Sequence, residues 1–217
     1  SYSERDASDL IRQVLEAVAY LHTLGIVHRD LKPENILFAD TSEDALIKVA
    51  DFGFAQKVMT AGLATDCGSP WYVAPEILTG IRYESSVDMW SIGVITYILL
   101  CGYPPFQADD QDELFDQIRE GSFTFDDEDW TSVSDHAMNF IHSTLEVDPL
   151  KRLSAAELLQ HPWMTAEVST ANRTPALEKL KQFNAKYRWK KAITTTVGVI
   201  KMKNRMRASV DKGSSAA

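Results

Sequence analysis

Apolar positions near the start of the chain follow the 3.6-residue period of a helix. Seven of them share this pattern: Ala7, Leu10, Ile11, Val14, Leu15, Val18 and Leu21. Ser3 and Asp6 have the spacing of a capping box, and Gly25 is suited to end the segment. The pattern predicts an amphipathic helix over residues 3–22.

Two short apolar runs come next, at residues 35–38 and 46–50, and a polar stretch separates them. Runs of this length around a polar turn predict a small β-hairpin. Residues 51–68 show no clean period and are rich in Gly, Thr and Asp. We expect a long surface loop there, and loops of this length are uncommon in compact domains unless they are functional.

Residues 86–100 are apolar on nearly every face, which predicts a buried central helix. Gly102 and the pair Pro104-Pro105 end it. Ser154 and Glu157 form a second capping-box pattern further along. Further helices are predicted over residues 111–120, 135–145 and 154–159.

Composition adds that the chain is one globular domain with an appendage. It has 217 residues, of which 45% are hydrophobic and 24% charged. Its longest apolar stretch, residues 89–100, is well short of the roughly 18 to 20 residues that span a bilayer. The two cysteines lack metal-ligand spacing, and the first residues are not those of a signal peptide. We therefore expect a reducing compartment, the cytoplasm and also the nucleus, and no membrane span.

The net charge of −9 conceals a strong asymmetry. Residues 175–217 hold 11 Lys and Arg against two acids, so they carry +9 and the preceding residues carry −18. An acidic body with a basic tail indicates that the tail docks on the body or binds an acidic partner.

Three short motifs carry the candidate chemistry. Residues 28–35 read HRDLKPEN, residues 51–53 read DFG after the predicted hairpin, and residues 74–76 read APE after the long loop. In this order they resemble the signature set of the protein kinases. The resemblance implies a protein kinase-like α+β fold, with residues 1–164 forming its mainly α-helical C-lobe with a small β-hairpin.

The resemblance also implies roles in phosphoryl transfer from ATP. Asp30 would accept the proton of the substrate hydroxyl, and Lys32 would reach the transferring phosphate. Asn35 and Asp51 would supply oxygen ligands to Mg²⁺. A lone Asp in a loop is ordinarily a turn or cap residue, but that reading leaves these four residues jointly unexplained.

Longer stretches narrow the resemblance. Residues 27–38 look like those of a Ser/Thr kinase, since Lys32 stands where tyrosine kinases differ. The stretches YILLCGYPPF at 97–106, DPLKR at 148–152 and HPW at 161–163 are similar to the calcium/calmodulin-dependent kinase group, and most to type I. The resemblance covers residues 2–207. It implies transfer of the ATP γ-phosphate to protein Ser/Thr hydroxyls under Ca²⁺/calmodulin control.

Further roles follow from position in the family pattern. Arg29 would bind a phosphate on the activation loop, and Thr65 would receive that phosphate from an upstream activating kinase. Thr65 is otherwise an ordinary polar loop residue. Ser69 would contact the catalytic Asp and Lys. Leu37 would pack under the adenine, or be a plain core residue.

The same pattern implies structural roles. Glu76 and Arg152 would form a buried ion pair that ties the loop to the helical core. Asp88 would support the backbone of the catalytic loop. Glu34 would attract a basic residue of the substrate.

Residues 183–207 hold eight basic residues and no acid. Trp189, Ile193 and Met202 are apolar anchors at a spacing that suits calmodulin, and the segment resembles the calmodulin-binding part of the type I kinases. We read residues 165–217 as an autoinhibitory and calmodulin-binding tail, of which residues 165–187 would cross the substrate cleft. A disordered basic tail, or one drawn to anionic membranes or nucleic acid, is the alternative, and we expect no nucleic-acid partner.

The chain lacks the motifs of a kinase N-lobe. None of its ten glycines forms G-x-G-x-x-G, and the first predicted helix already leads into the catalytic loop. We therefore expect a fragment or a truncated product with little activity of its own. The competing reading is a non-catalytic module that binds substrates or calmodulin, although the intact Asp30, Asn35 and Asp51 argue against it.

Overall fold

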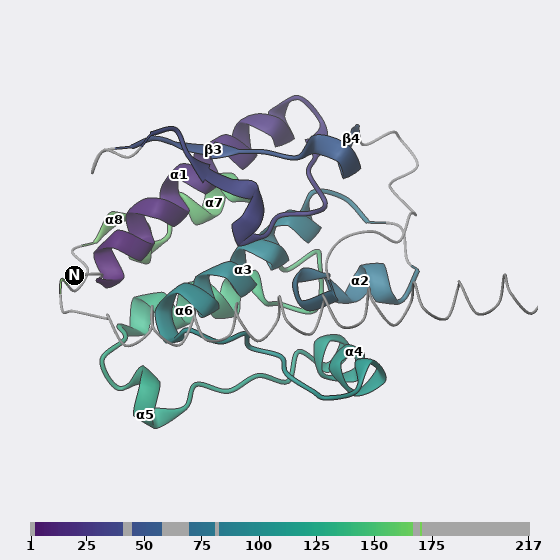
Figure 1. Ribbon diagram of the computed structural model, residues 1–217, viewed down its shortest axis with the longest axis vertical. Coiled ribbons are helices and arrows are strands. Elements are labelled where there is room, and N and C mark those ends of the chain that lie inside the picture. The colour runs from purple at the N-terminus through teal and green to yellow at the C-terminus, as the bar shows by residue number, and fades with distance from the viewer. Residues whose placement is uncertain (1–2, 41–44, 58–69, 81–82, 167–169, 171–217) are drawn as a thin grey trace, which may run out of the picture.

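Helix α3 (Ser86–Cys101) runs through the middle of the molecule, between α1 (Glu4–Thr23) and α6 (Asp135–Thr144) (Figure 1). The computed structural model describes residues 3–40, 45–57, 70–80, 83–166 and 170. Residues 28 and 29 follow α1 in the chain and bond to Asp88 at the start of α3, so the packing of these two helices positions them.

Helix α1 begins with the capping box that the sequence predicts. Ser3 Oγ accepts the backbone N–H of Asp6, and the Asp6 carboxylate accepts the backbone N–H of Ser3 at 2.7 Å. Its apolar face, from Ala7 to Val18, is buried. After the helix, Gly25 takes a left-handed conformation with φ of 69° and reverses the chain. The predicted helix is confirmed, with its last residue one position later.

The N-terminal turns of α1 also hold α6 and the segment near Trp163. Glu4 is fully buried, and its carboxylate accepts hydrogen bonds from the Ser134 hydroxyl at 2.5 Å and the Trp163 indole at 3.1 Å. Ser8 Oγ donates to the carbonyl of Trp163 at 3.1 Å. A buried carboxylate is tolerated only with such donors, so these bonds fix α6 and α8 (Pro162–Thr165) against α1.

Helix α3 is buried on nearly its whole circumference, as predicted. It packs closely on α6 at Gly93, where a Cβ would lie 2.4 Å from Thr144 Oγ1 and 2.9 Å from Leu145 Cδ2. The glycine therefore permits a helix contact that a side chain would prevent.

Gly93→Ala is expected to lower the free energy of unfolding by about 1–3 kcal/mol, since the methyl group overlaps Thr144. Urea unfolding measures the change. Thr144→Ala removes the nearest atom, so the double variant should lose less than the sum of the two single losses. Simple additivity would contradict this account of Gly93.

In the described part of the chain, four short strands form two antiparallel pairs. The predicted hairpin is confirmed as β2 (Ile36–Phe38) and β3 (Ile47–Val49), with Leu37 opposite Lys48. The second pair, β1 (Ile26–Val27) with β4 (Gln56–Lys57), was not predicted. The loop prediction for residues 51–68 is wrong over its first part, where a 3₁₀ turn (Phe52–Phe54) and β4 occur. Residues 58–68 lie outside the described part of the chain.

The remaining helices are shorter than α3. Two of them, α4 (Gln111–Glu120) and α7 (Ala155–Leu158), were predicted from the sequence and are confirmed. Helix α7 begins with the predicted capping box of Ser154 and Glu157. The hydrogen bonds from Ser154 lower the pKa of the Glu157 carboxyl. The short helices α2 (Pro75–Leu78), α5 (Asp127–Trp130) and α8, and the 3₁₀ turns Pro33–Asn35 and Pro70–Tyr72, were not predicted.

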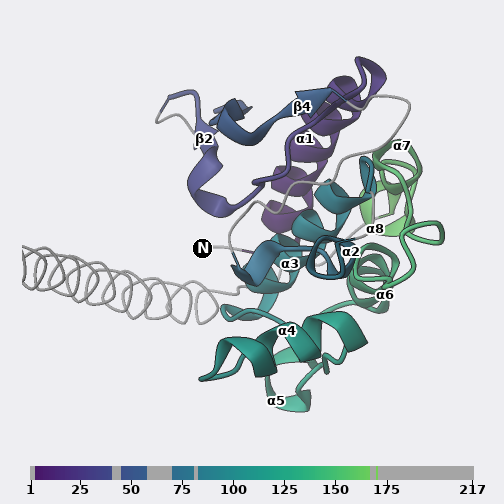
Figure 2. The ribbon, with the colours of Figure 1, turned by 90° about the vertical axis from the view of Figure 1, so that its right-hand side faces the viewer.

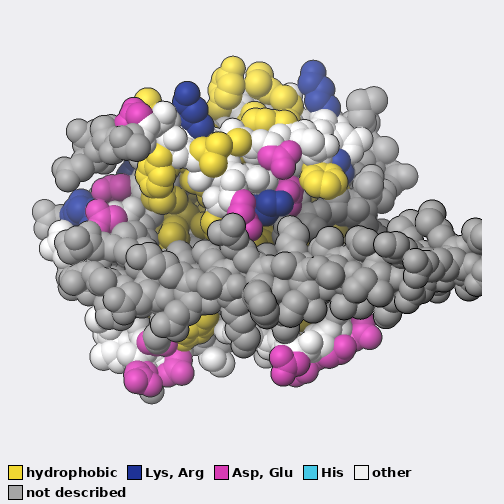
Figure 3. Space-filling view, in the orientation of Figure 1, with side chains coloured by type: hydrophobic (Ala, Val, Ile, Leu, Met, Phe, Trp, Pro, Cys, Tyr) yellow, Lys and Arg dark blue, Asp and Glu magenta, His cyan; other side chains and the backbone are white. Residues whose placement is uncertain are grey.

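The two ends of the molecule differ in chemistry. The strands and the C-terminal end of α1 lie at one end, and α4 and α5 lie at the other (Figure 2). Hydrophobic side chains gather at the first end and acidic side chains at the second (Figure 3). Exposed large apolar residues of the first end include Leu24, Leu37, Phe38, Leu46, Phe52 and Phe54. Among the described residues, no helix combines the length and apolarity that crossing a membrane requires.

Candidate active site

Asp30 lies at the centre of the candidate site. Its side chain is nearly buried, and its Oδ2 lies 2.5 Å from Lys32 Nζ. Asn35 Nδ2 donates to the Asp30 carbonyl at 2.8 Å and lies 3.3 Å from Oδ2. The 3₁₀ turn Pro33–Asn35 makes this possible, because it folds the chain back so that residue 35 meets residue 30. The structure thus brings together three of the four residues assigned to chemistry.

His28 joins this loop to the segment that begins at Asp51. Its Nδ1 accepts from the Asp30 N–H at 3.4 Å, and its Nε2 faces the Ala50 carbonyl at 3.0 Å, which requires Nε2 to carry the proton. Its ring also meets the edge of Phe52, with centroids 5.1 Å apart. In addition, the Ala50 N–H donates to the Asn35 carbonyl at 2.8 Å. The two motifs are therefore physically connected, although far apart in sequence.

Asp51 has an unusual backbone conformation, with φ of 62°, and its side chain is exposed. Its Oδ1 accepts the Gly53 N–H at 3.3 Å and caps the following 3₁₀ turn. A Cβ on residue 53 would lie 3.1 Å from this oxygen. The absence of a side chain at Gly53 therefore leaves room beside the Asp51 carboxylate. Gly53 does not itself have a positive φ; the residue with the left-handed conformation is Asp51.

Asp88 is fully buried at the start of α3 and holds the backbone of residues 28 and 29. Its Oδ1 accepts the Arg29 N–H at 2.8 Å, and its Oδ2 accepts the His28 N–H at 2.9 Å. Arg29 has φ of 68°, a conformation that typically costs about 1–3 kcal/mol and persists where its surroundings impose it. The two hydrogen bonds to the Asp88 carboxylate help to impose this conformation on Arg29.

The guanidinium of Arg29 is anchored to residues outside the 28–35 loop. Its Nε donates to the Phe54 carbonyl at 2.6 Å, and its Nη1 donates to the Tyr83 hydroxyl at 3.1 Å. Arg29 therefore links the 28–35 loop to the segment after Asp51 and to the chain that leads into α3.

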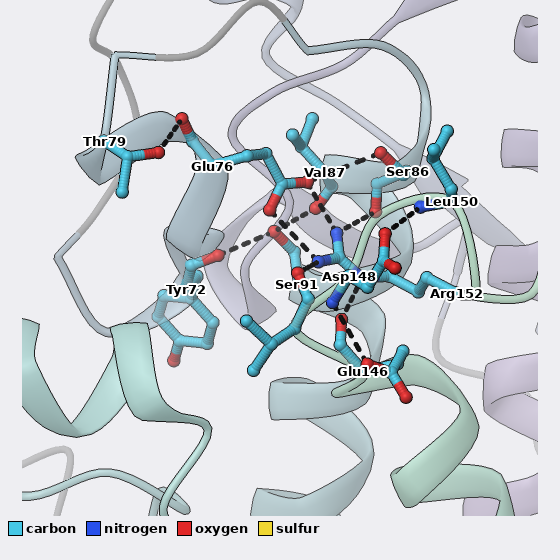
Figure 4. A network of polar contacts seen from close by, with 11 residues as sticks. Tyr72, Glu76, Thr79, Ser86, Val87, Ser91, Glu146, Asp148, Leu150 and Arg152 are labelled. Carbon is cyan, nitrogen blue, oxygen red and sulfur yellow. Dashed lines mark hydrogen bonds and ion pairs between the residues drawn. The ribbon is translucent and has the colours of Figure 1, made fainter.

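Glu76 and Arg152 form a buried ion pair at 2.7 and 3.0 Å (Figure 4). Both residues are at most 6% exposed. Arg152 also donates to the carbonyls of Ser86 at 2.9 Å and Glu146 at 2.8 Å, and its guanidinium lies 5.1 Å from the Trp90 ring centroid. A paired and fully hydrogen-bonded charge of this kind ties α2 to α3 and to residues 146–152.

The remaining predicted residues are placed less centrally or not described. Leu37 is 49% exposed on β2 and is not part of the hydrophobic core of the described residues. Glu34 is exposed on the 3₁₀ turn beside Asn35. Five predicted residues lie outside the described part of the chain: Thr65, Ser69, Trp189, Ile193 and Met202.

Two residues that contact this network, His22 and Tyr83, were not predicted from the sequence. His22 on α1 places Nε2 2.8 Å from Asp88 Oδ2, and Tyr83 accepts from Arg29. His22 lies four residues after Val18 and so continues the buried face of the helix, which is an unusual position for a polar residue. That position was the available signal. Tyr83 gave none, because it falls between elements.

The residues present fit a Mg²⁺ site of the kind that is shared with a bound nucleotide. Among the described residues, no group of three His, Cys, Asp or Glu side chains is arranged to hold a metal ion by itself. Mg²⁺ usually takes only one or two protein oxygens and completes its shell with phosphates and water. Asp51 offers an exposed carboxylate, and the hydrogen bonds of Asn35 to Asp30 use its nitrogen and leave its oxygen.

Comparison with known proteins places the chain in a family. The family model described as protein kinase domain matches residues 1–164, so the chain belongs to the protein kinase family, whose members use ATP and Mg²⁺. Its likeness within the family is to the calcium/calmodulin-dependent kinases. It is 48% identical over 205 residues to a calcium/calmodulin-dependent protein kinase type 1 of Macrobrachium nipponense. The aligned region covers 94% of the chain and 59% of that relative.

Two human relatives give the same result. A calcium/calmodulin-dependent protein kinase type 1B is 46% identical over 198 residues, with 90% of the chain and 58% of the relative covered. A calcium/calmodulin-dependent protein kinase type IV is 47% identical over 199 residues, covering 90% and 42%. The resemblance to this group and to type I is confirmed. The chain spans about three-fifths of the length of the type 1 relatives.

Proposed function

We propose that this chain forms the catalytic lobe of a Ser/Thr protein kinase, which transfers the γ-phosphate of ATP to hydroxyls of protein substrates. The observation that carries the proposal is the cluster of Asp30, Lys32 and Asn35, joined through His28 to the segment after Asp51. A lobe that only bound other proteins would have no need for this arrangement of charges.

Asp30 orients the substrate hydroxyl and accepts its proton. The hydrogen bonds from Lys32 and Asn35 hold its carboxylate in one orientation, which is what a general base requires. Lys32 is close enough to Asp30 to meet the phosphoryl group that reacts with the same hydroxyl, and its positive charge favours the charge that develops there.

Asp51 and Asn35 are the proposed ligands of Mg²⁺, which would neutralise the triphosphate charge. Their oxygens come from two segments, and the Asn35–Ala50 hydrogen bond keeps these segments together. The spacing between the two ligands therefore depends on the hairpin β2–β3 that separates them in sequence.

The exposed apolar end of the molecule supports a second lobe in the intact protein. Among the described residues, a group of large apolar side chains that includes Leu37, Phe38 and Phe52 is exposed there, and soluble proteins rarely leave such a group uncovered. A lobe that carries a Gly-rich loop would complete the ATP site against this surface, with Leu37 under the adenine. On this account the present chain alone transfers little or no phosphate.

Arg29 supports control by phosphorylation of the activation segment. A phosphate on Thr65, added by an upstream kinase, would gain charge-assisted hydrogen bonds from the Arg29 guanidinium. Arg29 also donates hydrogen bonds to Phe54 and Tyr83, so a phosphate bound by Arg29 would stabilise the positions of the catalytic loop and of the Asp51 segment together. Ser69 would add a contact to Asp30 and Lys32.

The basic tail supports control by Ca²⁺/calmodulin. The relatives carry this dependence in their names, and residues 183–207 combine eight basic residues with the apolar anchors Trp189, Ile193 and Met202. Residues 165–187 would cover the substrate cleft until calmodulin removes them. The opposite charges of body and tail favour this docking.

A peptide of residues 183–207 is expected to bind calmodulin only with Ca²⁺, and Trp189→Ala should weaken binding by about 2 kcal/mol or more, since a buried aromatic anchor is lost. Calorimetry or Trp fluorescence measures the affinity. Thr195→Ala serves as the control and should change it little. Binding without Ca²⁺, or binding only to anionic vesicles or nucleic acid, would contradict the assignment.

The activity itself is tested with the intact protein, a basic peptide that contains Ser and Thr, and ATP labelled at the γ-phosphate. Incorporation that requires Mg²⁺ supports the proposal. Absence of incorporation with calmodulin bound and the activation segment phosphorylated would overturn it.

A further inference from the structure

His22 lies outside the three kinase motifs, yet it touches the residue that holds the catalytic loop. Its Nε2 lies 2.8 Å from Asp88 Oδ2. Because a carboxylate can only accept, this ring nitrogen carries the proton and donates. The contact is largely shielded, since the Asp88 side chain is fully buried and the His22 side chain is 14% exposed.

The carboxylate of Asp88 is shared among three donors. Oδ2 accepts from His22 and from the His28 N–H, and Oδ1 accepts from the Arg29 N–H. His22 lies in the last turn of α1, while His28 and Arg29 follow the turn at Gly25 and strand β1. One carboxylate thus holds both sides of the connection between α1 and the catalytic loop.

The catalytic loop needs such support at Arg29. This residue has φ of 68° immediately before Asp30, and a conformation of this cost persists only where several contacts impose it. Asp88 can impose it only if its own side chain is fixed. The two backbone donors come from the loop that is to be held, whereas His22 comes from a long helix packed in the core. His22 is therefore the independent anchor.

We propose that His22 is a positioning residue of the catalytic loop: by donating from α1 to Asp88, it fixes the carboxylate that sets the backbone of Arg29 and, through it, the position of Asp30. The proposal rests on the proposed kinase function. It assigns no contact of His22 with substrate or nucleotide.

The surroundings of His22 allow substitutions that separate this role from simple packing. The imidazole borders a cavity of about 260 Å³, also lined by Ser85, Ser86, Met89 and Leu153. Side chains of similar size can therefore be accommodated without overpacking. Glutamine can present an N–H near the position of Nε2, whereas leucine fills similar space without a donor.

In the intact protein, His22→Leu is expected to lower kcat about tenfold and to leave KM for ATP and for the peptide within about twofold, since it displaces Asp30 without removing binding contacts. His22→Gln should restore kcat to within about threefold of the original. Thr23→Val is the matched control, because the Thr23 hydroxyl donates only to the Tyr20 carbonyl of its own helix.

Amide hydrogen exchange provides a readout that does not depend on activity. The N–H groups of His28 and Arg29 should exchange about tenfold faster in His22→Leu than in the original or in His22→Gln, while the core of α3 stays protected. If the intact protein transferred no phosphate at all, the proposed function would fail, but this comparison would still decide the role of His22. Equal kcat and equal exchange in His22→Leu and the original would overturn the proposal, as would equal impairment of the Leu and Gln variants.

Discussion

Asp30→Asn is expected to lower kcat for phosphoryl transfer by a factor of roughly 10² to 10⁴ and to leave ATP binding nearly unchanged. Asparagine has the size of aspartate and can still accept from Lys32 and Asn35, so the loop should keep its shape. It cannot take the proton of the substrate hydroxyl. The loss would therefore belong to the chemical step.

The measurement is the single-turnover rate of peptide phosphorylation by the intact protein, together with nucleotide affinity. Asp9→Asn is a matched control, because Asp9 is an exposed carboxylate of α1. It should leave both quantities unchanged. Equal rates for Asp30→Asn and the original protein would remove Asp30 from the chemistry, whatever the effect on stability.

Arg152→Leu is expected to lower the free energy of unfolding by about 3–5 kcal/mol, the cost of breaking a buried ion pair on one side. The Glu76 carboxylate would stay buried, at 5% exposure, without its two guanidinium donors. The carbonyls of Ser86 and Glu146 would lose a donor as well. Both effects act on the same part of the fold, where α2 meets α3.

Urea unfolding measures this loss, and the neighbouring residue provides the control. Lys151 forms an ion pair with Asp148 at 3.4 Å, but the two side chains are 72% and 40% exposed. Lys151→Leu should therefore cost at most about 1 kcal/mol. The double variant with Glu76→Met should regain part of the stability, because no unpaired charge is left. Similar losses for Arg152→Leu and Lys151→Leu would show that burial of the pair does not matter.

The sequence predicted the elements whose pattern repeats over several turns or strand residues. Helices α1, α3 and α4 and the β2–β3 hairpin were found because each carries a period, a cap or a turn of its own. Strands β1 and β4 are two residues long, and they pair segments far apart in sequence, with Ile26 opposite Lys57 and Val27 opposite Gln56. So short a segment contains no period, and only the tertiary fold defines it.

The site residues likewise divide into those that a local motif identifies and those that only the tertiary fold brings into place. The motifs identified Asp30, Asn35 and Asp51 through family resemblance, and the family pattern implied that Asp88 supports the loop backbone. The contacts that His22 and Tyr83 add were not predicted. The left-handed conformations of Arg29 and Asp51 could not be anticipated, because neither position is a glycine. His22 and Tyr83 contribute through contacts between segments more than 50 residues apart in sequence, for which a single sequence gives little signal.

The central claim is that the cluster around Asp30 serves phosphoryl transfer to Ser and Thr. It is tested most directly with three peptides that differ only in the acceptor residue, Ser, Thr or Tyr, and with the intact, activated protein and labelled ATP. The account predicts label on the Ser and Thr peptides, none on the Tyr peptide, and loss of all label with Asp30→Asn. Label on the Tyr peptide, or label on any peptide that survives Asp30→Asn unchanged, would contradict it.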